Sequence, residues 1–228
     1  MLRDFIKTRE RKLSKSKRKY FSCLDEFAIK KPEQLFEEKC KFSKINLEIG
    51  FGNGENILHQ ARIRSDELHI GCEVYKNGIS TLIGRLKSLQ IENVKIYYGN
   101  AIELIRNLPS HILRKVDILF PEPWKKRKHH KRRIVNKENI DLIYEKMTHQ
   151  GTLTIASDCT DYCQNLFSLI DQSNFFYKYE NIRHLRDLKK KLGKYEIVKT
   201  KYFIRAKMRG SDIYQFVLKI DKNRELGI

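Results

Sequence analysis

The part of the sequence best suited to do chemistry is a proline-rich turn around one acid, FPEPW at 120–124, followed by a run of basic residues at 125–133. We call these two segments the acidic corner and the basic tail. Residues 117–133 read DILFPEPWKKRKHHKRR. The two prolines restrict the backbone on both sides of Glu122, so its carboxylate can be held in one position. Trp124 offers a flat surface for a nucleic-acid base. We therefore expect Glu122 to be a catalytic carboxylate beside a surface that binds a polyanion.

The tail of this corner supplies that surface. We expect its cations to bind phosphates and its histidines to add hydrogen bonds: Lys125, Lys126, Arg127, Lys128, His129, His130, Lys131, Arg132 and Arg133. A plain turn followed by a basic targeting signal is the alternative, but such a signal needs no rigid Pro-acid-Pro-Trp segment before it. The side chains of adjacent histidines point apart, so we predict no metal site.

A glycine-rich turn follows an apolar run earlier in the chain. Gly50, Gly52 and Gly54 let the backbone turn sharply and let a ligand lie against it. A dinucleotide-binding turn would have its third glycine at position 55, but Glu55 stands there, and an acid beside a pyrophosphate is unfavourable. S-adenosylmethionine carries a sulfonium and an ammonium and no phosphate, so the nearby Glu48 suits it better. We predict S-adenosylmethionine as the cofactor and not NAD.

Two further polar residues end the next two predicted strands. Glu73 is placed to accept hydrogen bonds from both ribose hydroxyls, although an acid there would serve NAD equally well. Asn100 could read the edge of the adenine with its amide. With both residues at neighbouring strand ends, the glycine cluster is better interpreted as a cofactor site than as an ordinary turn.

The elements that must position these residues alternate between strand and helix. We predict strands at 45–50, 69–74, 94–98, 116–120 and 151–156, and helices at 55–64, 76–89, 101–108, 137–147 and 162–170. This alternation indicates a doubly wound, Rossmann-like α/β fold with a mostly parallel sheet. Two β-rich segments, 196–203 and 213–220, predict a closing antiparallel hairpin that brings the sheet to seven strands.

The composition supports a folded protein with a polyphosphate partner. The chain has 228 residues and a formal net charge of +19. The positive charge is concentrated in residues 1–20, 124–133 and 183–209, and the remainder is slightly acidic, which favours nucleic acid over a generally solvated surface. We expect residues 1–22 to be an extended arm or one that orders on RNA.

The cysteine spacing and the hydropathy indicate in which compartment of the cell the protein is found. The five cysteines include no C-x-x-C pair, which argues for a reducing environment and against zinc. No apolar run approaches the roughly 20 residues that a membrane span needs. We therefore expect a cytoplasmic protein that is not bound to a membrane.

These motifs resemble the bacterial tRNA (guanine-N7)-methyltransferases. The matching pieces are LEIGFGNG at 47–54, GCEVY at 71–75, FPEPW at 120–124 with its basic tail, SD at 157–158 and TKY at 200–202. The resemblance covers residues 45–220 and implies a methyltransferase domain at 45–228 behind a basic N-terminal extension at 1–44. It implies methyl transfer from S-adenosylmethionine to N7 of a guanine in tRNA, in the variable loop (position 46).

The resemblance also implies roles for single residues. Glu48, Glu73, Asn100 and Glu122 would line the cofactor pocket, and Lys126, Asp158 and Thr200 would contact the tRNA substrate. Three positions depart from the family pattern. Glu122 and Asn100 stand where the family usually has Asp, and Phe203 stands where it tends to have an acid. Part of the guanine-holding set is therefore expected to be missing or relocated.

Other functions stay open at this point. The basic segments alone would suit an RNA-binding protein without catalytic activity. A methyltransferase that acts on another RNA position, such as an adenine amino group, would also favour a proline-rich loop after the fourth strand. An NAD-dependent oxidoreductase is opposed by Glu55. The sequence does not distinguish a monomer from a homodimer.

Overall fold

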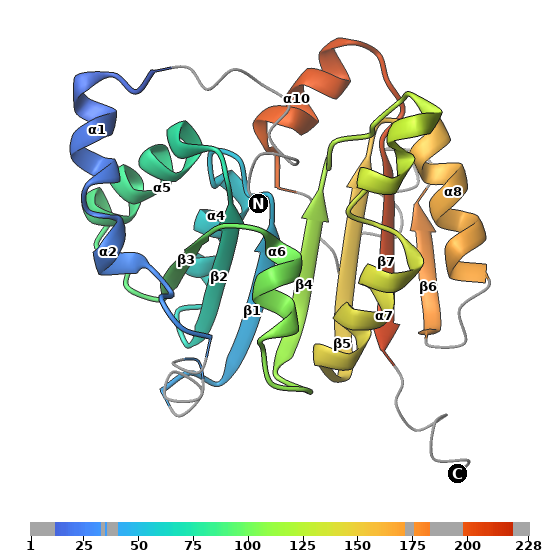
Figure 1. Ribbon diagram of the computed structural model, residues 1–228, viewed down its shortest axis with the longest axis horizontal. Coiled ribbons are helices and arrows are strands. Elements are labelled where there is room, and N and C mark those ends of the chain that lie inside the picture. The colour runs from blue at the N-terminus through green and yellow to red at the C-terminus, as the bar shows by residue number, and fades with distance from the viewer. Residues whose placement is uncertain (1–11, 33–34, 36–40, 172–175, 183–197, 221–228) are drawn as a thin grey trace. The chain divides into compact units, whose positions relative to one another are not determined.

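The computed structural model describes residues 12–32, 35, 41–171, 176–182 and 198–220, and the chain divides into two compact units, Met1–Pro109 and Ser110–Ile228 (Figure 1). Both units are built from β-strands and α-helices in alternation, as the sequence predicts. The elements of each unit determine which candidate residues come together within it.

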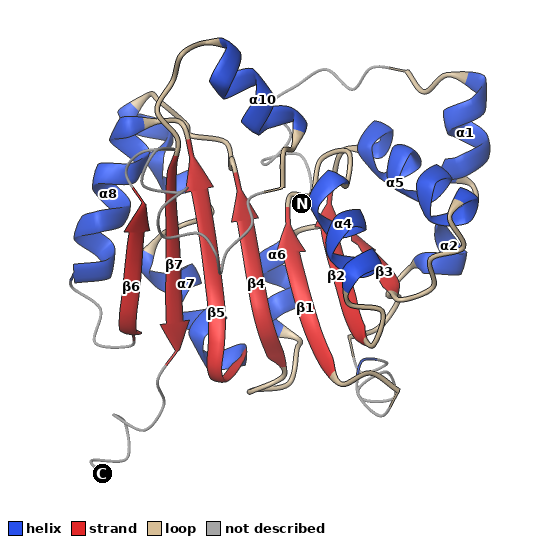
Figure 2. Ribbon diagram, turned by 180° about the vertical axis from the view of Figure 1, so that it is seen from behind, coloured by secondary structure: helices blue, strands red, loops and turns tan. Residues whose placement is uncertain are grey.

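The first unit contains three parallel strands with helices on both faces. The strands β1 (Lys44–Ile49), β2 (Glu67–Glu73) and β3 (Val94–Tyr98) lie in the order β3-β2-β1. They alternate with the helices α4 (Glu55–Ile63), α5 (Lys76–Ser88) and α6 (Ala101–Arg106). Figures 1 and 2 show α4 and α6 on opposite faces of these strands. Since parallel strands end at one edge, residues that follow β1, β2 and β3 lie near one another.

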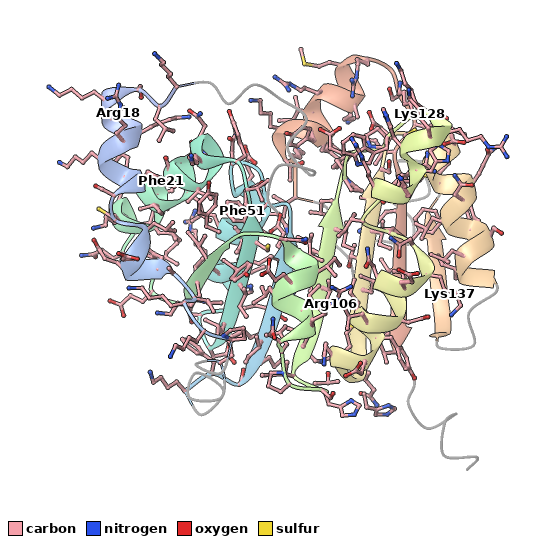
Figure 3. The ribbon with its side chains drawn as sticks, in the orientation of Figure 1. Arg18, Phe21, Phe51, Arg106, Lys128 and Lys137 are labelled. Atoms are coloured by element: carbon pink, nitrogen blue, oxygen red, sulfur yellow. The ribbon has the colours of Figure 1, made fainter. Side chains whose placement is uncertain are left out.

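Two short N-terminal helices belong to the first unit and pack against its core. The helix α1 (Lys15–Phe21) begins at Ser14, whose side chain accepts a hydrogen bond from the backbone N–H of Lys17, and α2 (Leu24–Phe27) follows. The Phe21 ring meets that of Tyr98 edge to face at 5.7 Å. Figure 3 shows Arg18 on the outer side of α1 and Phe21 facing the unit. The expectation of an extended arm is therefore wrong for residues 15–22, while residues 1–11 lie outside the described part of the chain.

The second unit contains four strands in the order β4-β5-β7-β6. The strands β4 (Leu113–Leu119) and β5 (Met147–Ser157) are parallel, and β7 (Tyr214–Ile220) is antiparallel to both β5 and β6 (Phe176–Ile182). The helices are α7 (Lys137–Lys146), α8 (Thr160–Asp171) and α10 (Lys201–Met208), with a 3-10 helix η2 (Arg127–Arg132) after the acidic corner. Figure 1 shows α10 beyond the ends of β4 and β5.

The C-terminal antiparallel pair is confirmed, but its first strand was predicted in the wrong segment. Residues 201–208 form the helix α10, and β7 pairs instead with β6. Residues 196–197 lie outside the described part of the chain. The segment is helical because the Thr200 hydroxyl accepts a hydrogen bond from the backbone N–H of Phe203 and because Phe203 and Ala206 share one buried face.

The described residues thus form seven strands: β1, β2 and β3 are parallel to one another, β4 and β5 are parallel, and β7 is antiparallel to both of its neighbours. The prediction of a doubly wound, mostly parallel α/β fold with a C-terminal antiparallel pair is confirmed. Among the described residues, no helix combines the length and the apolar character that crossing a bilayer requires.

Candidate active site

The glycine turn of the first unit has the backbone that its sequence requires. Gly50, Gly52 and Gly54 all have positive φ, at +72°, +57° and +77°, which glycine adopts without steric cost. A side chain at Gly54 would meet Leu82 at 2.7 Å, whereas a side chain at Gly50 would meet nothing within 4 Å. The turn is therefore packed tightly against α5 on one side and open at Gly50.

Glu73 binds this turn directly. Its Oε2 accepts a hydrogen bond of 2.8 Å from the backbone N–H of Gly52, and its Oε1 accepts from the N–H groups of Val74 and Tyr75 at 2.7 and 3.0 Å. Burial raises the pKa of Glu73, and these three donors oppose the rise. Because Oε1 already accepts two bonds, Oε2 is the oxygen with capacity for a ligand hydroxyl. Glu73 thus holds the turn closed in addition to its expected role at a ribose.

Two other predicted cofactor residues, Glu48 and Asn100, lie at or just after the ends of β1 and β3. Glu48 is buried in β1 and accepts a hydrogen bond of 3.0 Å from the side chain of Asn56. Asn100 caps α6, because its Oδ1 accepts from the N–H of Ile102 at 2.9 Å. The amide nitrogen of Asn100 is then the atom that could donate to an adenine. An Asp at this position would have no such donor, which gives the departure from the family pattern a chemical consequence.

These residues fit S-adenosylmethionine better than a dinucleotide. Glu55 occupies the first turn of α4, where a pyrophosphate would need the positive end of the helix. The space at Gly50 leaves room for a ligand against the backbone. The carboxylates of Glu48 and Glu73 favour a ligand that carries positive charge. When bound there, S-adenosylmethionine supplies an electrophilic methyl group on a sulfonium.

The acidic corner of the second unit has a strained backbone. Phe120 and Trp124, which flank the Pro-Glu-Pro segment, have φ of +52° and +43°. Such angles cost roughly 1–3 kcal/mol for a non-glycine residue and persist only where the surroundings impose them. Glu122 is exposed between them. Two of the five non-glycine residues with positive φ in the described part of the chain thus flank the predicted catalytic carboxylate.

Trp124 does not offer the free surface that we expected. Its side chain is only 4% exposed, the His129 ring meets it edge to face at 5.8 Å, and the Arg132 guanidinium lies 5.1 Å from its centre. The expectation of a base-stacking platform is therefore wrong for this conformation. Trp124 anchors the corner to the basic tail that follows it.

Phe120 packs against the C-terminal helix. It contacts a buried cluster formed by Phe203, Ala206 and Ile213. Phe203 stands where the family tends to have an acid, and here it is a core residue at 4% exposure. The departure at this position thus replaces a potential substrate ligand with an apolar contact that connects α10 to the acidic corner.

The basic tail divides into exposed and buried members. Six cations are exposed and available to phosphates, namely Lys125, Lys126, Arg127, Lys128, Lys131 and Arg132. Lys128 marks this stretch in Figure 3. His129 and His130 are half-buried. Arg133 differs from these cations, because its side chain is 5% exposed and is engaged by protein groups; its expected contact with RNA stays a prediction.

Thr200 caps the start of α10, and Asp158 pairs with the residue at its end. Asp158, just after β5, accepts a 2.6 Å hydrogen bond from the Arg209 guanidinium at the end of α10. Thr200 is buried and caps the start of the helix by accepting from the N–H of Phe203 at 3.2 Å. Their predicted contact with tRNA stays a prediction, and any such contact by Asp158 competes with or extends its pairing with Arg209.

The described residues include no group of three or more His, Cys, Asp or Glu side chains arranged to hold a metal ion. The cysteines within the described ranges are all free thiols. Burial raises the pKa of the Cys72 thiol, and it raises that of Cys163 to about 12. Both thiols are therefore protonated at neutral pH and are poor nucleophiles.

Comparison with known proteins identifies the family to which this arrangement belongs. A family model with the description "Putative methyltransferase" matches residues 43–216. A tRNA (guanine-N(7)-)-methyltransferase of Wolbachia pipientis wMel is 40% identical over 152 residues, which are 66% of this chain and 69% of that protein. The chain belongs to the tRNA (guanine-N(7)-)-methyltransferase family. The resemblance seen in its motifs is confirmed, and with it the assignment as an S-adenosylmethionine-dependent methyltransferase.

Other relatives cover different shares of the chain. The tRNA (guanine-N(7)-)-methyltransferase of Buchnera aphidicola is 34% identical over 78% of this chain and 73% of its own. The protein of that name from Nitrosococcus oceani is 40% identical over 59% of this chain and 58% of its own. A protein of Rickettsia typhi named "Bifunctional methyltransferase" is 38% identical, and this chain spans only 30% of its length.

Solved structures share the fold at low sequence identity. A 16S rRNA methyltransferase gives a TM-score of 0.59 at 11% identity and covers 83% of this chain and 93% of its own. An antibiotic-related methyltransferase gives a TM-score of 0.57 at 16% identity, with 82% and 92% covered. These similarities confirm the Rossmann-like methyltransferase fold.

Proposed function

We propose that this member of the family transfers the methyl group of S-adenosylmethionine to N7 of a guanine in the variable loop of tRNA (position 46), in the cytoplasm. The observation that carries the proposal is the strained Phe-Pro-Glu-Pro-Trp corner with six exposed cations directly after it, in a chain that belongs to this family. The backbone of the glycine turn in the first unit supports S-adenosylmethionine as the methyl donor.

The chemistry makes positioning the main task of the protein. Guanine N7 carries an in-plane lone pair, so no base is needed to create the nucleophile. The N7–methyl bond forms as the bond from the methyl carbon to sulfur breaks, and the electron pair of the broken bond stays on sulfur. Correct orientation of the two reactants can contribute roughly 7–11 kcal/mol. A rigid corner serves this purpose better than a mobile loop.

Glu122 is the residue proposed to act on the guanine. Positive charge spreads into the purine as N7 attacks, and a carboxylate that accepts hydrogen bonds from the N1 and N2 hydrogens stabilises that charge. The exposed carboxylate of Glu122 lies on the rigid corner and is suited to this role. Asp158 is the second acid proposed for this role. Its carboxylate would accept from the guanine either beside its hydrogen bond from Arg209 or after that bond breaks.

The exposed cations are proposed to bind the RNA backbone. Lys126 and the five exposed cations around it would replace counterions on tRNA phosphates, so tRNA affinity should fall steeply as the salt concentration rises. Because base-specific RNA recognition favours unstacked nucleotides, the target guanine is expected to leave its stack on binding.

A tRNA that lacks the nucleophilic atom tests the proposal most sharply. We would assemble one tRNA with guanosine at position 46 and one with 7-deazaguanosine there, and follow transfer from methyl-labelled S-adenosylmethionine. The two RNAs keep the same pairing edge, so binding should be alike while transfer disappears from the deaza substrate. Continued transfer to the deaza tRNA would reject N7 of that guanine and indicate another RNA position. Binding of tRNA without transfer to either substrate would indicate an RNA-binding protein.

A further inference from the structure

Arg133 has a different environment from the other cations of the basic tail. Its Nε donates to the carbonyl oxygen of Pro123 at 3.0 Å, and its terminal NH2 donates to Asp161 at 2.5 Å. The Cζ atom of its guanidinium lies over the ring of Tyr162, 5.2 Å from the ring centre. Asp161 and Tyr162 belong to the first turn of α8, so Arg133 connects the acidic corner to this helix.

The backbone of Arg133 makes two more connections. Its N–H donates to the carbonyl oxygen of His130 at 2.9 Å, which ends η2. Its carbonyl oxygen accepts from the side chain of Asn136 at 3.0 Å, and Asn136 in turn caps α7. One residue thus joins the corner, η2 and the beginnings of α7 and α8.

The charge of Arg133 is balanced within the protein. The hydrogen bond from Arg133 lowers the pKa of Asp161, so this carboxylate is ionised at neutral pH. The terminal NH2 also lies 2.9 Å from Nε2 of His130, which can accept from it as a neutral ring. A guanidinium held by these groups at 5% exposure has little to offer a phosphate.

We propose that Arg133, held by Asp161, is a positioning residue that fixes the acidic corner in its strained conformation and so places Glu122. The inference rests on the proposed function. Pro123 has no N–H, so its carbonyl is its one backbone group that can be hydrogen-bonded, and Arg133 takes it. The peptide unit held in this way leads directly into Trp124 at φ +43°. Fixing that peptide sets the direction of the segment that carries Glu122.

Two conservative variants test the inference. Arg133→Lys keeps the charge but loses the planar fork that bonds Pro123 and Asp161 together. Asp161→Asn keeps the shape and removes the charge. For both we expect kcat to fall roughly 10- to 100-fold, while the dissociation constant for tRNA and its salt dependence change by no more than about twofold. Lys128→Ala, in the same tail, should show the contrasting pattern of weaker tRNA binding and a flatter salt dependence.

A double variant separates positioning from general weakening. Because Arg133 and Asp161 act through one contact, the combined variant should lose little more kcat than either single variant. Melting temperatures of all variants identify any loss of the folded state. If Arg133→Lys fails to fold, Asp161→Asn alone carries the test.

The chain contains a single tryptophan, which reports on the corner without any activity measurement. Quenching of Trp124 fluorescence by acrylamide should increase in Arg133→Lys and Asp161→Asn and stay unchanged in Lys128→Ala. If the wild-type protein makes 7-methylguanosine while both conservative variants keep full kcat and a protected Trp124, the inference is wrong and the function stands. If the wild-type protein makes none, the proposed function fails, and the quenching data still decide whether Arg133 holds the corner.

Discussion

The contact between α5 and the glycine turn gives a prediction whose size can be worked out from the structure. A Cβ atom added at Gly78 would lie 2.0 Å from the carbonyl oxygen of Gly52 and 2.8 Å from its carbonyl carbon. Both groups are backbone, so neither can rotate away. The helix and the turn would have to separate by at least about 1 Å.

The same helix offers a matched control. A Cβ atom at Gly84 would meet the ring of Tyr20 at 3.1 Å, and this exposed ring can shift by a few tenths of an ångström. Both Gly78→Ala and Gly84→Ala add one methyl group to α5 and gain about the same helix propensity, roughly 0.5–1 kcal/mol. Any difference between the two variants therefore reports on the neighbour that each methyl group meets.

Overpacking of this kind costs roughly 1–3 kcal/mol. If the cost falls on the glycine turn, Gly78→Ala should weaken S-adenosylmethionine binding by about 5- to 150-fold, since 1.4 kcal/mol corresponds to tenfold. Isothermal titration of both variants and the wild-type protein with S-adenosylmethionine measures this, and thermal melts show that they are folded. Equal affinity in Gly78→Ala and Gly84→Ala would refute the assignment of this turn as the cofactor site.

Further predictions concern the carboxylates, the basic tail and the C-terminal helix. Glu122→Ala should lower kcat far more than tRNA affinity, whereas Lys126→Ala should weaken binding and flatten its salt dependence; equal losses of both parameters in the two variants would contradict these roles. Glu73→Gln should weaken S-adenosylmethionine binding by about tenfold, because an amide NH2 would face a backbone N–H donor; unchanged affinity in a direct titration would contradict this. Phe203→Glu, which restores the acid usual in the family, should destabilise the protein by about 3 kcal/mol or more, because it buries a carboxylate among apolar side chains; a melting temperature that falls less than in Phe203→Leu would show that the position is not a core site.

The parts of the fold that depend on local pattern were predictable from the sequence. The alternating strands and helices between Ile45 and Asp171 occur in the predicted order, and β3 has the predicted limits of Val94 and Tyr98, although β4 and β5 begin three and four residues earlier than predicted. The glycine turn was predictable because only a small set of residues tolerates positive φ. These signals lie within a few consecutive residues, so the sequence alone displays them.

The N-terminal helix was missed because its charge concealed its pattern. Lys17, Tyr20, Phe21 and Leu24 recur at helical spacing, and Ser14 is a good N-cap. Tyr20 lies against Gly84, Phe21 and Leu24 pack against the core, and the Lys17 ammonium donates to Asn77. The density of lysine and arginine around these residues suggested a solvated arm. The signal was present in the sequence but was outweighed by composition.

The features of the site that the sequence did not reveal have a different origin, because they depend on tertiary contacts. Nothing in the run of nine basic residues distinguishes Arg133 from Arg132, yet Arg133 is buried against Asp161, 28 positions away. The aromatic and β-branched residues around Thr200 resemble a strand until the burial of Phe203 against Phe120 is known. Burial of this kind cannot be deduced from residue type or spacing.

Nucleoside analysis of the tRNA product tests the central claim most directly. Unmodified tRNA with a guanosine in its variable loop would be incubated with the protein and S-adenosylmethionine, digested to nucleosides and separated by mass spectrometry against standards. The account predicts one new 7-methylguanosine per tRNA, formed much more slowly when Glu122→Ala replaces the wild-type protein. A methyl group found instead on an adenine amino nitrogen, on another guanine atom or on a ribose would contradict it.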